Sequence, residues 1–149
     1  MGIRVLCLAA LLFGTTALAD DFADRAKLAG TWQVEKEGGA DAGATWVLED
    51  KNTSFHITRS EGNQKVADYE CTILGKECQV KDGGKQVKVS LYFSGAKLVE
   101  METKGSAVVK REFSAGGAPD SLEMSVTSIV PTGKSEMTHL KRVQVSAAR

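Results

Sequence analysis

Apolar and polar residues alternate along most of the chain in short runs. The clearest run is residues 87–93, where valine, leucine and phenylalanine occupy every second position. The same alternation recurs at residues 55–58, 69–73 and 122–127. A period of two is typical of antiparallel strands that bury one face. The pattern therefore predicts an all-β protein.

Glycine-containing turns separate these runs at regular intervals and leave room for eight to ten strands. The expected strands are residues 30–36, 44–50, 53–60, 65–73, 76–81, 85–93, 96–103, 106–114, 120–129 and 135–144. Tight turns without a long crossover favour an up-and-down meander, and closing a meander into a barrel removes its exposed edges. We expect an antiparallel up-and-down β-barrel, with a two-sheet sandwich as the alternative.

The segment just before the first strand has a different pattern. Residues 20–29 form a lead-in whose sequence is compatible with a short helix over 21–29, capped by Asp20 or Asp21. Such a helix would place Phe22, Ala26 and Ala29 on one face. We expect the barrel to occupy residues 30–144, with a tail at residues 145–149.

The first nineteen residues have the features of a secretion signal. Arg4 is followed by a short apolar run over residues 5–13, and Ala17-Leu18-Ala19 is a small-residue cleavage pattern. The apolar run is too short to span a bilayer as a helix. We expect cleavage after Ala19, export to the periplasm or the extracellular space, and no stable membrane insertion.

The charge distribution argues against nucleic acids and membrane surfaces as partners. The chain has 19 Lys and Arg residues and 19 Asp and Glu residues, and the two signs are interspersed. Nucleic-acid binding requires a concentrated basic face, which this distribution lacks. A polybasic membrane-surface module is disfavoured for the same reason.

Two cysteines remain once the signal segment is removed, and their spacing predicts a disulfide. A hairpin that turns at residues 74–75 would place Cys71 directly opposite Cys78. Opposed residues in an antiparallel pair have Cα atoms about 4.5–5.5 Å apart, within the reach of a disulfide. Export supports an oxidised pair, whereas a metal site would need more ligands. We expect a structural bond, with free structural thiols as the alternative, and no metal or cofactor.

The stretch "KLAGTW" gives a more specific indication. A short helix that leads into Gly30-Thr31-Trp32 at the first strand of an exported meander resembles the start of the lipocalin and calycin group. In that group the Trp plugs the closed end of the barrel, which implies this role for Trp32. Gly30 would let the backbone pass from helix to strand without a Cβ clash. The whole chain after the signal segment is also similar to small secreted bacterial lipocalin-like proteins.

The resemblance also implies a partner for Trp32. The group places a cation from the end of the last strand across the face of this Trp, and Arg142 is the matching residue. Lys141 points the opposite way by alternation. A cation over an indole contributes about 0.5–2 kcal/mol.

Several large apolar residues fall on the predicted inward phase and are candidates to line a ligand cavity, although plain core packing is the default explanation for them. They are Trp46, Phe55, Tyr69, Leu91, Phe93, Met101 and Met124. Arg59 and Arg111 share that phase. An inward arginine can bind a carboxylate, as in the fatty-acid-binding branch of this group, but at a strand end it can also reach solvent.

Catalytic chemistry is not indicated. His56 and His139 fall on outward positions without an evident acid–base partner. Nucleophile-elbow, zinc-protease and phosphate-loop motifs are absent from the sequence. We therefore predict a monomeric exported binding protein for a small apolar or amphipathic ligand, and not an enzyme. The alternative is a protein-interaction module, such as an envelope scaffold or a barrel-type protease inhibitor that uses residues 20–27.

Overall fold

The computed structural model describes residues 17–35 and 43–144, with side chains from Ala23 onward. One helix, α1 (Ala17–Leu28), is followed by ten strands. The expected tail, and the expected signal segment up to residue 16, lie outside the described residues. Cleavage after Ala19 stays a prediction.

The ten strands agree with the expected ones to within two residues at each end. They are β1 (Gly30–Val34), β2 (Ala44–Asp50), β3 (Ser54–Glu61), β4 (Gln64–Thr72), β5 (Cys78–Asp82), β6 (Lys85–Ser94), β7 (Lys97–Lys104), β8 (Ala107–Ala115), β9 (Ser121–Val130) and β10 (Ser135–Arg142).

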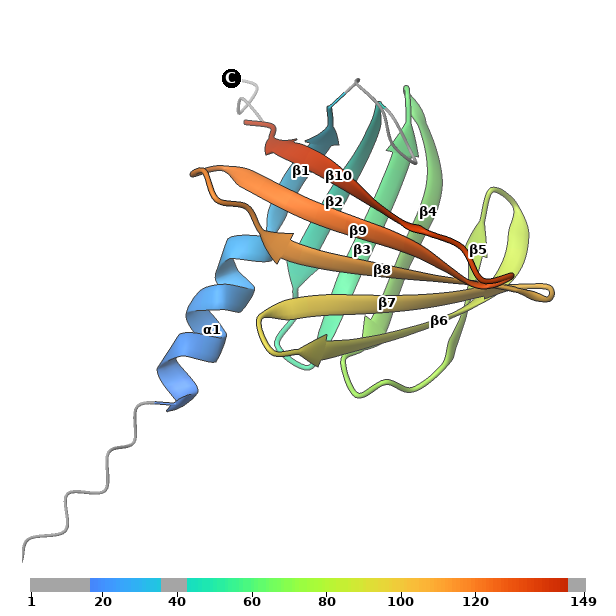
Figure 1. The fold of residues 1–149 in the computed structure, drawn as a ribbon, viewed down its shortest axis with the longest axis horizontal. Coiled ribbons are helices and arrows are strands. Elements are labelled where there is room, and N and C mark those ends of the chain that lie inside the picture. The colour runs from blue at the N-terminus through green and yellow to red at the C-terminus, as the bar shows by residue number, and fades with distance from the viewer. Residues whose placement is uncertain (1–16, 36–42, 145–149) are drawn as a thin grey trace, which may run out of the picture.

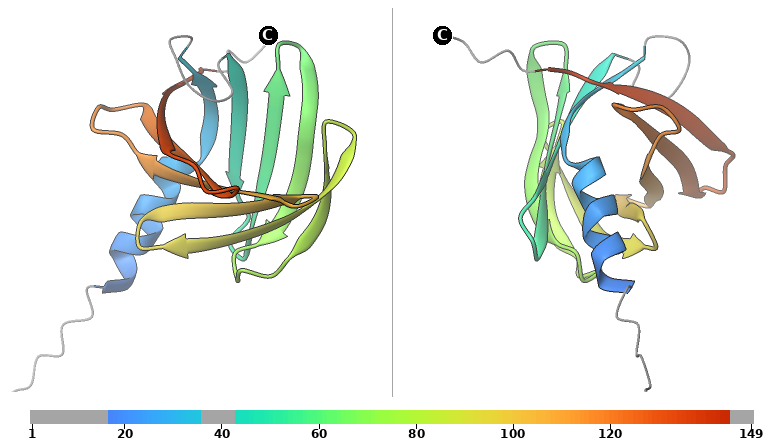
Figure 2. Two further views of the ribbon diagram at one scale, coloured as in Figure 1. Left: turned by 45° about the vertical axis from the view of Figure 1, so that its right-hand side comes forward. Right: turned by 90° about the vertical axis from the view of Figure 1, so that its left-hand side faces the viewer.

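The strands form a closed barrel in which each pairs antiparallel with its neighbours in sequence (Figures 1 and 2). Strand β1 also pairs with β10, which closes the barrel. The predicted up-and-down barrel is therefore confirmed over the sandwich. Closure gives the first and last strands the same protection from edge pairing as the others.

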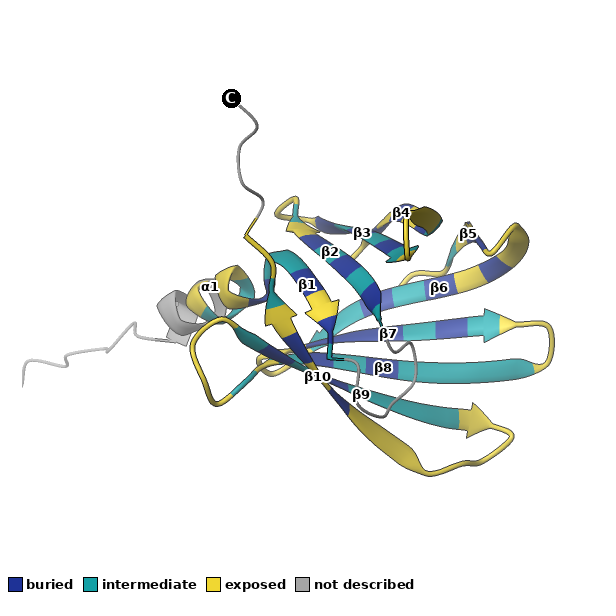
Figure 3. Ribbon diagram, turned by 90° about the horizontal axis from the view of Figure 1, so that it is seen from above, coloured by how far each residue is buried: buried dark blue, intermediate teal, exposed yellow. Residues whose placement is uncertain are grey.

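Alternation along each strand produces the core. Buried positions alternate with more exposed ones along the strands, and exposed residues gather at the turns (Figure 3). In β6, Val87, Val89 and Leu91 are buried while Lys88 is exposed. The inward positions of all ten strands contribute to one continuous apolar cluster around Trp32 and Trp46, because period-two side chains share one face.

The wall of the barrel is weakest between β4 and β5. These strands share one bridged pair, Ala67 with Asp82. The expected tight turn at residues 74–75 does not form, and the connection instead pairs with β6, where Gly75 N–H donates to Leu91 O at 2.8 Å. The register of the bridged pair, Ala67 with Asp82, is nevertheless the predicted one, in which Cys71 lies opposite Cys78. What the structure lacks is the tight hairpin turn that was expected between them.

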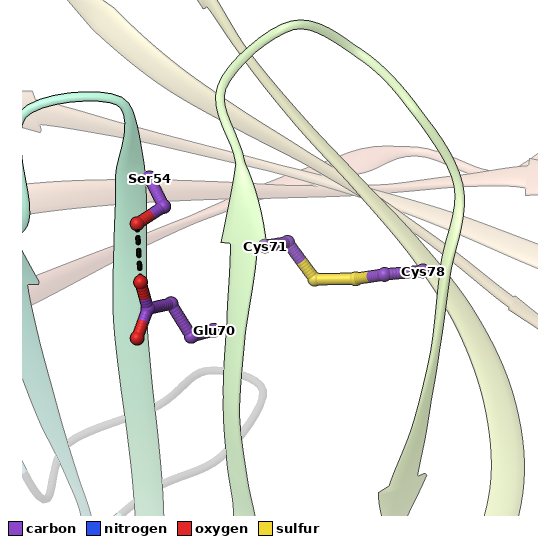
Figure 4. The surroundings of a disulfide bond; sticks show 4 residues. All are labelled: Ser54, Glu70, Cys71 and Cys78. Carbon is purple, nitrogen blue, oxygen red and sulfur yellow. Dashed lines mark hydrogen bonds between the residues drawn. A yellow bond between two sulfur atoms is a disulfide. The ribbon is translucent and has the colours of Figure 1, made fainter.

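The predicted disulfide itself is present. Cys71 and Cys78 are bonded across the gap between β4 and β5, with their Cα atoms 6.2 Å apart (Figure 4). Cys71 is buried, as its inward phase predicts. On the neighbouring outward positions, the Ser54 hydroxyl donates to the Glu70 carboxylate and ties β3 to β4. A covalent bond thus spans the stretch of wall that lacks a hydrogen-bonded ladder.

Helix α1 lies at one end of the barrel and runs directly into β1 (Figure 1). It begins at Ala17, so the expected cap residues Asp20 and Asp21 lie inside it. The predicted apolar face is also wrong at Ala26, which is exposed, whereas Leu28 is fully buried. Leu28 is the residue that inserts into the core because it immediately precedes the turn into β1.

Arg25 fixes the helix to the barrel. Its guanidinium donates to both carboxylate oxygens of Asp50, at 3.1 and 2.6 Å, and to the Asn52 carbonyl at 2.7 Å. It also lies over the rings of Phe55 and Phe93, with centroids at 5.8 and 5.2 Å. A bidentate contact of this kind fixes the orientation of the helix on the barrel as well as its position.

The residues of the "GTW" stretch meet the last strand as the resemblance implies. Trp32 is paired with Arg142 across β1 and β10, and the guanidinium lies 4.3 Å from the indole centroid. The Trp32 Nε1–H donates to Leu28 O at 2.9 Å. Arg142 donates from Nη1 to Ala29 O and from Nε to Asp120, at 3.0 and 2.9 Å. The predicted contact between Trp32 and Arg142 is confirmed.

Gly30 makes this arrangement possible. Its φ is +146°, a conformation that side chains with a Cβ rarely adopt, and a Cβ there would lie 2.2 Å from Arg142 Nη1. The Arg142 guanidinium cannot move away without losing its contacts with Ala29, Asp120 and the Trp32 ring.

We therefore expect Gly30→Ala to lower the free energy of unfolding by about 2–3 kcal/mol, from backbone strain and loss of the Arg142 contacts. Urea denaturation measures this. The control is Gly117→Ala, because a Cβ there has no neighbour within 4 Å. Equal stability of the two variants would contradict the role of Gly30.

The disulfide should stabilise the barrel through the short loop that it closes. Replacing both Cys71 and Cys78 by Ala should lower the free energy of unfolding by about 2–3 kcal/mol. Wild-type protein unfolded in the presence of reductant should give the same midpoint as the double variant. A double variant as stable as the oxidised wild type would refute a stabilising role.

Candidate functional site

Among the residues whose side chains are described, five charged ones are buried inside the barrel, and we call them the interior polar cluster. Each comes from an inward position of a strand and is at most 8% exposed. The members are Arg59 of β3, Asp82 of β5, Glu100 and Glu102 of β7, and Arg111 of β8. Buried charges are uncommon unless paired, so the pairing within this cluster determines its chemistry.

Arg59 is paired with the end of β5. Its Nη2 donates to Asp82 Oδ1 at 2.6 Å, and Glu61, nearer the turn into β4, lies 3.9 Å away. The Arg59 guanidinium carbon lies 5.6 Å from the Trp46 ring centroid. The guanidinium therefore satisfies a carboxylate and covers an aromatic face at once.

Arg111 holds the other side of the cluster. Its Nη1 donates to Glu100 Oε1 at 3.2 Å and lies 3.7 Å from Glu102 Oε2. Glu100 and Arg111 are directly opposed across β7 and β8. The Arg111 guanidinium also lies 5.6 Å from the Trp46 centroid. Trp46 thus contacts both arginines of the cluster.

Burial changes the titration of two inward groups. The pKa of Glu102 is raised from 4.5 to about 7, first by burial and then by Asp82 and Glu100, while Arg111 opposes the shift. The pKa of Tyr69 is raised well above its usual value, mainly by burial and also by the Glu100 carboxylate. Tyr69 is therefore a neutral phenol at physiological pH.

Not every polar atom of the interior is satisfied by the protein. Trp46 Nε1, Glu100 Oε2, Arg59 Nε and Thr138 Oγ1 are buried and have no hydrogen-bond partner among the described residues. Buried polar groups are normally paired with protein or with ordered water, so each exception calls for an explanation. The interior therefore offers both donors and acceptors next to an apolar wall.

The predicted cavity-lining residues are mostly inside the barrel. Phe55, Leu91 and Met124 are fully buried, as is Trp46 at 1% exposure. Tyr69 is buried as well. These placements agree with the predicted inward phase, whereas a role in ligand binding stays a prediction.

Phe93 and Met101 differ from the other predicted lining residues. Phe93 is partly buried and packs edge-on against Phe55, with ring centroids 5.8 Å apart. Met101 is opposed to Ser90 and Lys110, on the outward face of its strand. The prediction that Met101 lines the interior is wrong, because Leu98, Glu100 and Glu102 occupy the inward phase of β7.

A cavity of about 510 Å³ lies at the helix end of the barrel. It is bordered by α1, the β4–β5 connection and the β6–β7 hairpin. The lining residues are Asp24, Arg25, Ile73, Leu74, Tyr92, Phe93, Gly95 and Ala96. Phe93 therefore extends from the core of the barrel to a cavity, and Leu74 on its rim is 73% exposed.

His56 has partners that the sequence analysis missed. It lies on the outward face, as predicted, but its Nδ1 and Nε2 are each 2.5 Å from a carboxylate, of Glu49 and Asp68. The bond to Glu49 and then that to Asp68 raise the pKa of His56, because both favour the charged ring. With both nitrogens engaged by carboxylates, the ring acts as a cationic bridge between β2, β3 and β4.

Within the described part of the chain, no group of His, Cys, Asp and Glu side chains is arranged to hold a metal ion. In the same residues, no helix is long and apolar enough to cross a membrane.

Comparison with known proteins identifies the fold. No family model and no curated protein matches the chain. A solved structure of the REP1-NXSQ fatty acid transporter is similar, with a TM-score of 0.66 and 18% identity over 81% of this chain and 99% of that one. The chain therefore has a calycin-type barrel of the kind seen in fatty-acid-binding proteins.

Two other solved structures share this fold at similarly low identity. Zebrafish ileal bile acid-binding protein complexed with cholic acid gives a TM-score of 0.59 and 18% identity, covering 78% of this chain and 99% of that one. Secretory abundant heat soluble protein 4 from Ramazzottius varieornatus gives 0.60 and 16%, covering 79% and 96%. The likeness extends across almost the whole length of each neighbour.

The raised pKa of Glu102 has a consequence for stability. A raised pKa in the folded state means that its stabilising contribution is present below pH 4.5 and is lost as the pH rises through about 7. We expect Glu102→Gln to be more stable than the wild type at about pH 8, by on the order of 2–3 kcal/mol, and the difference to vanish near pH 4.

Thermal unfolding at several pH values measures this difference. His56 shifts the wild-type curve in the same direction above pH 6.5, so the readout is the difference between variant and wild type. Glu112→Gln is the control, because Glu112 is opposed to the outward Val99 and Ser125 positions and pairs with Lys110 at 3.6 Å. A Glu102→Gln curve parallel to the wild type would show that Glu102 titrates normally.

Proposed function

We propose that the protein is an exported barrel that binds a small apolar or amphipathic molecule and performs no catalysis. The observation that carries this proposal is the interior itself. Large apolar side chains form its wall, and buried polar atoms such as Trp46 Nε1 and Glu100 Oε2 have no partner among the described residues. An apolar site with a few convergent polar groups is the usual composition of a small-molecule site.

The structural neighbours support the same class of ligand. One is a fatty acid transporter, and another is a bile acid-binding protein in complex with cholic acid. The interior of a closed barrel with about eight to ten strands is either filled by side chains or holds one small ligand. Because fold alone does not determine function, the proposal depends on the unpartnered polar atoms as well as on this likeness.

Export is supported by independent features. The N-terminal nineteen residues have the pattern of a secretion signal, and Cys71–Cys78 is a disulfide, which is typical of oxidising compartments. A secretory protein is among the structural neighbours. The interaction-module alternative is less well supported, because Arg25 and Leu28 attach the last turns of α1 to the barrel.

The binding proposal predicts saturable uptake of a neutral apolar probe such as N-phenyl-1-naphthylamine, with one site per chain. Val126 faces inward, opposite Arg111, and is partly buried against the core. Val126→Trp should fill the interior and weaken probe binding by about tenfold or more. Fluorescence titration measures the affinity.

The control is Ser125→Trp, one residue away on the outward face opposite Glu112. It adds the same side chain without entering the interior, so probe affinity should stay at the wild-type value. Circular dichroism of both variants checks that the barrel still forms. Absence of saturable binding by the wild type, or equal binding by both variants, would rule out an interior site.

A further inference from the structure

The charges inside the barrel favour one class of ligand over another. The interior polar cluster contains two guanidiniums and three carboxylates, and all five side chains are nearly inaccessible to solvent. When every group is ionised, the cluster is therefore negative rather than positive. A buried anionic ligand would meet repulsion here, because charges interact more strongly inside a protein than in water.

Both arginines are already engaged by carboxylates of the chain. Asp82 lies 2.6 Å from Arg59, and Glu100 lies 3.2 Å from Arg111. A carboxylate ligand would have to displace one of these acids from its arginine. The displaced acid would be left buried without its partner, which is strongly destabilising.

A neutral ligand meets a different environment. Trp46 Nε1 is a buried donor and Glu100 Oε2 a buried acceptor, and neither makes a hydrogen bond of good geometry with a described residue. The Tyr69 hydroxyl lies near the Glu100 carboxylate and is a further polar group of the same site. The Trp46 and Glu100 side chains are each 1% exposed and both lie beside Arg111, so they line the same part of the interior. An alcohol hydroxyl can donate to a carboxylate oxygen and accept from an indole N–H without disturbing either ion pair.

We propose that the barrel selects amphipathic molecules with a neutral hydroxyl-bearing end, such as long-chain alcohols, and discriminates against the corresponding carboxylates. This selectivity rests on the proposed binding function. The apolar wall of the barrel would hold the hydrocarbon portion, while Trp46 and Glu100 would receive the hydroxyl.

The test uses two ligands that differ only at the polar end. Hexadecan-1-ol and hexadecanoate compete with N-phenyl-1-naphthylamine for the full-length barrel at about pH 8, where both Glu102 and the fatty acid are largely ionised. We expect the concentration of alcohol that displaces half of the probe to be at least about tenfold lower than the corresponding concentration of acid.

The variant Glu100→Gln removes one interior charge and frees Arg111 from its nearest carboxylate. It should strengthen hexadecanoate binding and reduce the preference for the alcohol by about tenfold. Glu112→Gln is the matched control on the neighbouring strand, since it removes the same charge from the outward face and should leave the preference unchanged. If Glu100→Gln does not fold, Glu102→Gln removes a charge from the same cluster and takes its place.

The outcomes separate the two proposals. Acid binding as tight as alcohol binding, with saturable probe uptake intact, would overturn the selectivity and leave the binding function standing. A preference for the alcohol that Glu100→Gln and Glu112→Gln alter equally would overturn the assignment to the interior polar cluster. Failure of the wild type to take up the probe or either ligand would overturn both proposals.

Discussion

The contact between Trp32 and Arg142 is the constraint on which the rest of the barrel depends. It lies within the backbone ladder that joins the first strand to the last and leaves the sheet without free edges. The same guanidinium reaches back to the Ala29 carbonyl, and the same indole reaches back to Leu28. The position of the helix and the closure of the barrel are thereby determined together, and the absence of a side chain at Gly30 is what allows both.

The closed barrel carries paired charges in its interior. The two arginines that fall on apolar phases do not reach solvent, because the barrel surrounds them. They are neutralised by acids from β5 and β7, and they cover the ring of Trp46. Replacing a buried ion pair with apolar residues of equal volume is often neutral or stabilising, so stability alone does not account for this cluster.

Sequence alone was sufficient for the strands, because period-two alternation and glycine turns are local signals that the barrel reinforces. It was insufficient to predict which residues of β7 face the interior. The tight turn at residues 95–96 opposes Phe93 to Leu98 and therefore Leu91 to Glu100. Applying this register to the sequence would have placed Glu100 and Glu102 inside and Met101 outside. The prediction assigned apolar residues to inward positions and therefore missed the acids of the site. These acids are buried because arginines from other strands pair with them.

At the β4–β5 connection, the sequence predicted the covalent bond correctly and the backbone turn incorrectly. Its spacing predicted the disulfide, but the tight turn was lost because residues 74–75 pair with β6. The barrel is thus closed by hydrogen bonds around most of its circumference and by one covalent bond at this seam. Strands that border such a seam present backbone groups that can pair with another chain. The bond between Cys71 and Cys78 holds β4 and β5 together at this seam, so its reduction would leave their backbone groups more open to pairing with a second chain.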